Sequence, residues 1–187
     1  EELPLIGVVG HPRFIAENPF AIRVFPSASD EAKVLVQSVD REGQRIAIIS
    51  LEDEYFLGLR DAFVKNLRNS VVVFNETLSP KDLEFSTLIA KMKSKSPNAI
   101  LINAGPNQIP ILIHKMRELG VDSSLYSNFL AGAQDVISAL GRDGDGLRYA
   151  ELDYERPRFV EAFTRIVGKK PLSPLSYACY VAMTYAI

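Results

Sequence analysis

The feature that most constrains this chain is an alternation of short apolar segments with amphipathic segments, repeated five times after Ala21. The apolar segments have the length and aliphatic content of buried strands, and the segments between them have helical periodicity. Strand cores are predicted at residues 22–25, 46–49, 71–74, 99–102 and 146–149, with a sixth short strand at 125–129. This spacing predicts an α/β fold, a doubly wound parallel sheet with helices on both faces. Such sheets bind ligands beyond the carboxyl ends of their strands.

Capping signals indicate where the helices begin. Ser29, Asp30 and Glu31 supply a cap and first-turn acids for a helix that runs to about residue 42. Ser79 followed by Pro80 is typical of an N-cap with proline at the first helical position, so a helix is predicted to begin there, after a loop. The other helices are expected at residues 55–68, 134–140, 157–167 and 174–187, with one more after the loop at 104–108 that has Pro110 in its first turn and ends at Gly120.

Composition narrows the class of protein. The chain has 187 residues, of which 47% are hydrophobic and 24% charged, and this suits one α/β domain with a fragment of another. The net charge of −2 and the shortness of the basic stretches at 91–95 and 169–170 argue against a nucleic-acid partner. The single cysteine, Cys179, is expected to be a buried, inert thiol on an apolar helix. No apolar run approaches a membrane span, and no signal peptide is recognisable.

No catalytic or cofactor-binding pattern stands out. His11 and His114 lie on different segments, and His114 is interpreted as a surface or capping residue. The sequence has no Gly-x-Ser-x-Gly elbow, no Walker A loop and no Gly-x-Gly-x-x-Gly motif after a strand. The acids at 52–54 lack the spacing that wraps a cation, and a helix start explains them more simply. We therefore expect no enzyme activity, no cofactor and no metal.

The predicted strand ends instead carry polar and aromatic residues suited to holding a small molecule. Amide and phenol groups can hydrogen-bond a ligand, aromatic rings can cover it, and a glycine lets backbone approach it closely. Each residue singly could have a purely structural role; jointly they suggest a binding edge. The set comprises Tyr55, Asn103, Gly105, Asn107, Gln108, Asn128, Phe129 and Tyr177.

Several motifs, in order, resemble the type 1 periplasmic binding proteins of the leucine/isoleucine/valine-binding kind, which are receptors for ABC transporters. The stretch Asn-Pro-Phe-Ala-Ile-Arg-Val-Phe-Pro-Ser at 18–27 is similar to that family's entry into its second lobe. Tyr-Phe-Leu-Gly at 55–58 resembles the family's Tyr-Gly-x-Gly, with Phe56 in place of the first glycine. Arg-Glu-Leu-Gly at 117–120, Gly-Leu-Arg-Tyr-Ala at 146–150 and the Gly-Lys-Lys-Pro tail at 168–171 also fit.

The resemblance implies a flavodoxin-like lobe of a two-lobed receptor that closes on its ligand. Residues 1–20 would hold the last strand of the first lobe and a crossover, and residues 21–187 the second lobe, with most of the first lobe missing. Implied partners are a small-molecule ligand, the membrane subunits of an ABC transporter and that first lobe, in the periplasm or outside the cell. The implied ligand contacts are Tyr55, Gly105, Pro106, Asn107, Asn128, Phe129 and Tyr177.

One departure from the family bears on the ligand. Amino-acid binders of this family often carry an acid after the fifth strand to pair with the ligand's ammonium, whereas this sequence has Asn128, Phe129 and Leu130 there. A ligand with an aromatic or neutral head is therefore hypothesised. The leading interpretation is a solute-binding protein of an importer, the alternative a sensor domain of a signalling receptor or regulator, and the third a flavodoxin-like enzyme. The strand at 5–10 is further predicted to promote self-association as an exposed edge.

Overall fold

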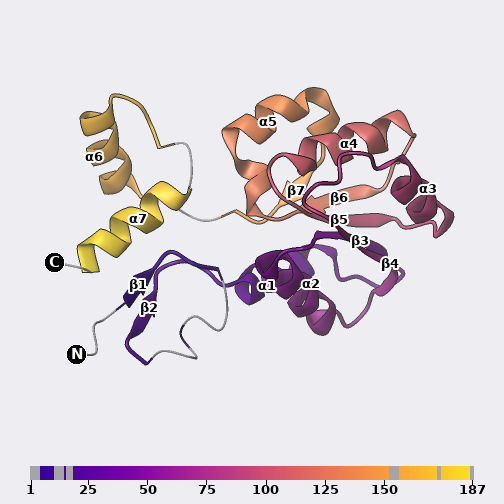
Figure 1. The fold of residues 1–187 in the computed structure, drawn as a ribbon, viewed down its shortest axis with the longest axis horizontal. Coiled ribbons are helices and arrows are strands. Elements are labelled where there is room, and N and C mark those ends of the chain that lie inside the picture. Colours follow the sequence, from indigo (N-terminus) through magenta and orange to yellow (C-terminus); the bar gives the residue numbers. More distant parts are fainter. Residues whose placement is uncertain (1–4, 11–14, 16–18, 152–155, 172–173, 186–187) are drawn as a thin grey trace. The chain divides into compact units, whose positions relative to one another are not determined.

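The computed structural model describes residues 5–10, 15, 19–151, 156–171 and 174–185 (Figure 1). The chain divides into two compact units, one of Glu1–Ser27 with Glu151–Ile187 and the other of Ala28–Ala150. The second unit contains the regular alternation of strands and helices. The expected lobe division at residue 20 stays a prediction.

The unit Ala28–Ala150 is built on a five-stranded sheet in the order β4-β3-β5-β6-β7. Every neighbouring pair of strands is parallel. Because β4 lies on one side of β3 and the later strands follow on the other, the winding direction reverses between β3 and β5, and this is where a doubly wound sheet binds ligands. The strands are β3 (Arg45–Leu51), β4 (Val71–Leu78), β5 (Ala99–Asn103), β6 (Ser124–Ser127) and β7 (Arg148–Tyr149).

Helices cover both faces of this sheet, which confirms the predicted fold class (Figure 1). Along β3, Ile46 and Ile48 pack into one apolar cluster and Ala47 and Ile49 into the other, as the two-residue period of a strand requires. Helices α1 (Ala28–Val39) and α2 (Glu54–Asn66) complete the first cluster. The second cluster is completed by α3 (Ser86–Ser94), α4 (Gln108–Glu118) and α5 (Gln134–Leu140), next to the 3-10 turns η2 (Phe129–Gly132) and η3 (Gly141–Gly144).

In its described residues, the other unit holds two short strands and two helices. Its elements are β1 (Leu5–Gly7), which pairs parallel with β2 (Ala21–Arg23), α6 (Pro157–Val167) and α7 (Pro174–Tyr185). Phe159 of α6 packs against Tyr177 and Tyr180 of α7, with ring centroids 5.2 and 5.3 Å apart. Among the described helices of the whole chain, none combines the length and apolar character that a bilayer crossing needs.

The segment after the second central strand differs from the prediction. β4 continues to Leu78, where a loop was expected, because its partner β3, after a register shift between Ile46 and Ala47, pairs with it up to Leu51. The next helix begins at Ser86 and not at Pro80. The carboxylate of Asp82 accepts a hydrogen bond from the backbone N–H of Ser79, and the Asp82 N–H donates to the Ser79 carbonyl, so the proline occupies a closed turn.

Two smaller expectations are also wrong. Cys179 is exposed, and the residues of α7 that pack on Phe159 are Tyr177 and Tyr180. β6 ends at Ser127, and the Asn128 side chain then caps η2 by accepting a hydrogen bond from the N–H of Leu130, so the strand does not extend to Phe129.

Candidate functional site

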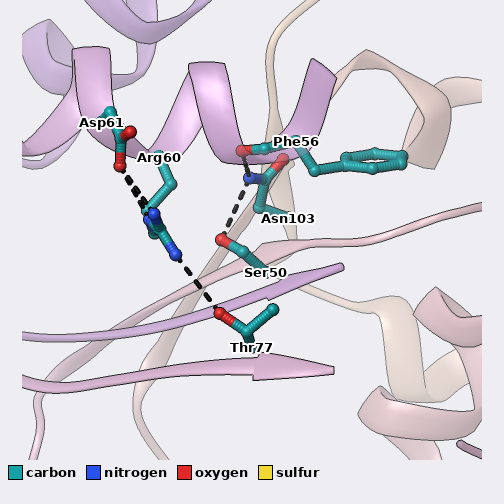
Figure 2. Close-up of polar contacts among 6 residues, drawn as sticks. All are labelled: Ser50, Phe56, Arg60, Asp61, Thr77 and Asn103. Atoms are coloured by element: carbon teal, nitrogen blue, oxygen red, sulfur yellow. Dashed lines mark hydrogen bonds and ion pairs between the residues drawn. The ribbon is translucent and has the colours of Figure 1, made fainter. Parts of the chain in front are cut away.

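A buried network of amide hydrogen bonds lies at the carboxyl ends of the neighbouring strands β3 and β5, where the sheet reverses its winding (Figure 2). Asn103, the last residue of β5, donates through Nδ2 to Ser50 Oγ at 3.1 Å and to the carbonyl oxygen of Phe56 at 2.6 Å. Both Ser50 and Asn103 are completely buried. Since Phe56 lies in the first turns of α2, the network fixes where this helix begins relative to two strand ends.

Asn128 extends this network to the third strand end. Its Nδ2 donates to the carbonyl oxygen of Ala104 at 2.9 Å and lies 3.4 Å from Asn103 Oδ1. Its Oδ1 accepts from the N–H of Leu130 at 3.0 Å. Asn128 is as fully buried as Asn103. In this unit both amides are therefore engaged in internal hydrogen bonds that shape the binding edge.

A second set of contacts lies alongside in Figure 2 and ties α2 to the edge strand β4. Arg60 donates through Nη1 to Thr77 Oγ1 at 3.2 Å, and through Nε and Nη2 to Asp61 Oδ1 at 2.9 and 2.8 Å. The Asp61 side chain is 69% exposed, so the ion pair itself adds little stability. The contact with Thr77 holds α2 in place beside the strand ends.

Glu31 brings a carboxyl group to the same edge of the sheet. It lies in the first turn of α1 and is only 8% exposed. Its Oε1 accepts a hydrogen bond from the backbone N–H of Phe129 at 2.7 Å, and its Oε2 accepts one from the hydroxyl of Tyr55. Burial raises the pKa of Glu31 to about 7, although both hydrogen bonds act to lower it. Near neutral pH this carboxyl group therefore exchanges between its charged and neutral forms.

Tyr55 and Phe129 form the aromatic part of the site. Their ring centroids lie 6.2 Å apart at 85°, an edge-to-face arrangement, and Tyr55 also meets Phe56 edge-to-face at 5.4 Å. Burial, together with the charge and hydrogen bond of Glu31, raises the pKa of Tyr55. The phenol therefore stays protonated and remains a hydrogen-bond donor. Asp53 caps α2 by accepting a hydrogen bond from the N–H of Tyr55 at 2.9 Å, which positions the tyrosine in the first turn.

The loop after β5 is partly exposed, unlike the buried amide network. Pro106 and Asn107 are exposed, and Asn107, although at the N-cap of α4, makes no side-chain capping hydrogen bond. Gly105 is buried, and a Cβ at this position would lie 2.8 Å from Oε1 of Gln108. The missing side chain therefore gives room to Gln108, whose Nε2 donates to the carbonyl oxygen of Pro80 at 3.2 Å.

The structure thus brings two of the predicted contacts, Tyr55 and Phe129, around a residue that the sequence analysis treated only as a first-turn acid. Tyr177 belongs to the other compact unit, where it packs on Phe159. The signal for Glu31 was present in the sequence: it shares a helical face with Ala28, Ala32 and Leu35, all of them buried. An acid on the buried face of a helix at a strand-end edge is a candidate functional residue.

Within the described residues, no three His, Cys, Asp or Glu side chains gather where they could hold a metal ion. His114 is exposed on α4, where Nδ1 lies 2.5 Å from Asp143 Oδ2 and Nε2 lies 3.0 Å from the carbonyl oxygen of Ala139. It therefore links α4 to α5 and η3, and the prediction of a surface histidine is confirmed.

Comparison with known proteins identifies the family. A family model described as periplasmic binding protein matches residues 1–187, and the chain belongs to this family. The resemblance seen in the sequence is thereby confirmed.

Solved structures of similar fold agree with this assignment. A leucine binding protein from Thermotoga maritima has a TM-score of 0.83 at 22% identity, covering 98% of this chain and 55% of that one. An extracellular ligand-binding receptor from Rhodopseudomonas palustris has a TM-score of 0.82 at 17% identity, covering 98% and 56%. The isoleucine complex of a branched-chain amino acid transporter substrate binding protein from Streptococcus pneumoniae has a TM-score of 0.81 at 15% identity, covering 97% and 56%.

At these identities the likeness establishes the fold, which matches one lobe of a type 1 periplasmic binding protein. The chain spans about half the length of the solved structures it matches.

Proposed function

We propose that this chain is part of a solute-binding receptor of an ABC importer, a non-enzymatic protein that captures a small molecule between two lobes. The observation that carries the proposal is the carboxyl edge of the sheet in Ala28–Ala150. There a rigid amide network holds the strand ends, and Glu31, Tyr55 and Phe129 supply charged, polar and aromatic groups. Such an arrangement on rigid elements suits reversible recognition of a small molecule.

The proposed ligand is an amino acid or a related aromatic or amide metabolite. The support comes from the proteins of similar fold, which are described as a leucine binding protein and as a transporter substrate binding protein in complex with isoleucine. Because these descriptions concern transport, we favour the importer over the sensor. The proposed partners are a further lobe and the membrane subunits of the transporter, with residues 1–20 in the first lobe and the binding residues in the second. The proposed location is the periplasm or the cell exterior.

The proposed ligand contacts within Ala28–Ala150 are Tyr55, Asn128, Phe129 and the loop Gly105, Pro106 and Asn107, with Tyr177 from the other unit. We assign them unequal roles. Tyr55, Phe129 and Asn107 would contact the ligand directly, since they carry aromatic surface or an exposed amide. Asn128 would act by holding its loop in place, since its amide is already hydrogen-bonded.

A thermal-shift screen tests the proposal. The full-length protein is heated with amino acids, aromatic acids and small amides, and this chain of 187 residues serves as the control. A ligand at about a hundred times its dissociation constant stabilises the native state by roughly 2.7 kcal/mol, which is readily measured. We expect a shift in the full-length protein and little in the chain alone, because half of the contacts would be missing. Absence of a shift with every solute would contradict the proposal.

A further inference from the structure

We propose that Glu31 forms a subsite for the cationic amino group of the solute, with Tyr55 and Phe129 as its walls. This inference rests on the proposed function and narrows it to solutes that carry a primary amine. It changes the expectation drawn from the sequence, in which the lack of an acid at residues 128–130 favoured a neutral ligand head.

The position of the Glu31 carboxylate supports this subsite. Glu31 Oε1 lies 2.7 Å from the backbone nitrogen of Phe129, so an acid stands next to the β6–η2 connection although that connection contains none. It reaches this place from α1, 98 residues earlier in the chain. A carboxylate accepts about four hydrogen bonds, and the N–H of Phe129 and the Tyr55 hydroxyl use two. Capacity therefore remains for the N–H donors of an ammonium group.

The lack of a positively charged partner for Glu31 among the described residues also supports the subsite. Within the described part of the chain, acids such as Asp30, Asp61 and Glu118 pair with a lysine or an arginine, whereas Glu31 takes part in no ion pair. A buried carboxylate without a cation is costly, and a neutral hydroxyl with one backbone N–H compensates it only in part. A ligand ammonium would supply the absent charge, and charge-assisted hydrogen bonds are about twice as strong as neutral ones.

The neighbouring acid shows that helix capping does not explain Glu31. Asp30 occupies the same first turn, its side chain is 51% exposed, and it pairs with Lys33 at 3.3 Å. An exposed acid of this kind already provides the favourable interaction with the helix dipole. Glu31 is buried instead, and burial outweighs its hydrogen bonds in setting its pKa. The interaction with the helix dipole does not require burial, so the buried placement of Glu31 points to a role at the strand ends.

The aromatic rings fit the same ligand chemistry. Tyr55 and Phe129 meet edge-to-face with Glu31 bonded to both residues. A cation bound to the carboxylate would lie beside these aromatic side chains, and ring faces attract positive charge. Tyr55 is the titratable side chain that bonds to Glu31 from α2, while the β6–η2 connection contributes the backbone N–H of Phe129.

Calorimetry on the full-length protein tests the subsite. The probes are the standard L-amino acids and simple primary amines, and each one that binds is compared with the same molecule lacking its amino group. The variants are Glu31→Gln and, as a matched control, Asp30→Asn, which removes the same charge from the exposed neighbour. We expect the aminated probe to bind best, Glu31→Gln to weaken it roughly 10- to 100-fold, and Asp30→Asn to change it less than about twofold.

A second measurement needs no variant and so does not depend on whether Glu31→Gln folds. Binding of the aminated probe to the unmodified protein is measured in two buffers of different ionisation enthalpy. Because burial raises the pKa of Glu31 to about 7, an ammonium that binds its carboxylate should release protons at about pH 6 and fewer at about pH 8.

The outcomes separate the inference from the proposed function. Equal binding to Glu31→Gln and the unmodified protein, or no proton release at about pH 6, would overturn the subsite. Capture of aromatic acids or amides without any amine would also overturn the subsite and leave solute capture standing. Failure of every probe, aminated or not, would overturn both.

Discussion

Replacing Asn103 with alanine tests whether the amide network at the winding reversal holds the binding edge together. The substitution removes the two hydrogen bonds donated to Ser50 Oγ and to the Phe56 carbonyl oxygen, and it leaves the buried Ser50 hydroxyl without its partner. Two net hydrogen bonds of about 1 kcal/mol each, with part of the desolvation cost of the orphaned groups, give a loss of about 3 kcal/mol. This is a large effect for a single substitution at the end of a strand.

Amide hydrogen exchange of the β3 and β5 peptides is the suitable assay, because the chain has two compact units and exchange reports each segment separately. A loss of about 3 kcal/mol would speed exchange of these peptides by roughly two orders of magnitude. Asn107→Ala is the matched control, since Asn107 is exposed and makes no capping hydrogen bond, and its effect should stay within about 0.5 kcal/mol. Similar exchange rates in the two variants would refute the reasoning.

Two further predictions concern pH. Partial burial raises the pKa of Asp40, but hydrogen bonds from the Ser70 side chain and the N–H groups of residues 68–70 outweigh this and lower it. The ionised Asp40 therefore stabilises the folded state above about pH 4, and this stabilisation is lost as pH falls through the lowered pKa. In urea titrations, Asp40→Ala should lower the free energy of unfolding by about 1–2 kcal/mol at neutral pH and by little in acid. A loss that does not change with pH would contradict this. The hydrogen bond to Asp143 raises the pKa of His114. The stabilisation of the folded state by protonated His114 is therefore complete below about pH 6.5 and is lost as pH rises through the raised pKa. An NMR titration of His114 with a midpoint below about pH 6.5 would contradict this prediction.

The sequence predicted the fold well because buried strands and amphipathic helices leave strong periodic signals. The strand at Ala99–Asn103 and the helix at Pro157–Val167 lie close to where they were expected. The segment between Leu78 and Ser86 was predicted wrongly because Ser-Pro opens turns as well as helices, and only the tertiary pairing with β3 extends β4. Local signals do not contain that pairing.

The candidate site was only partly predictable for a related reason. Tyr55 lies in the first turn of the helix after β3, and Phe129 begins the turn after β6, so topology alone places both near the binding edge. Glu31 reaches the same place from a helix that precedes the first strand of the sheet, and its contact with Phe129 spans 98 residues. A helix-dipole interpretation accounts for any first-turn acid, and only burial distinguishes Glu31 from Asp30. The three-dimensional contact therefore had to come from the structure.

The most direct test of solute capture at this edge is a crystal structure of the full-length protein with its solute bound. We predict that the solute lies beyond the carboxyl ends of β3, β5 and β6, against Tyr55 and Phe129, with its amino nitrogen about 3 Å from the carboxylate of Glu31. A solute bound elsewhere, with no contact to the unit Ala28–Ala150, would contradict the account.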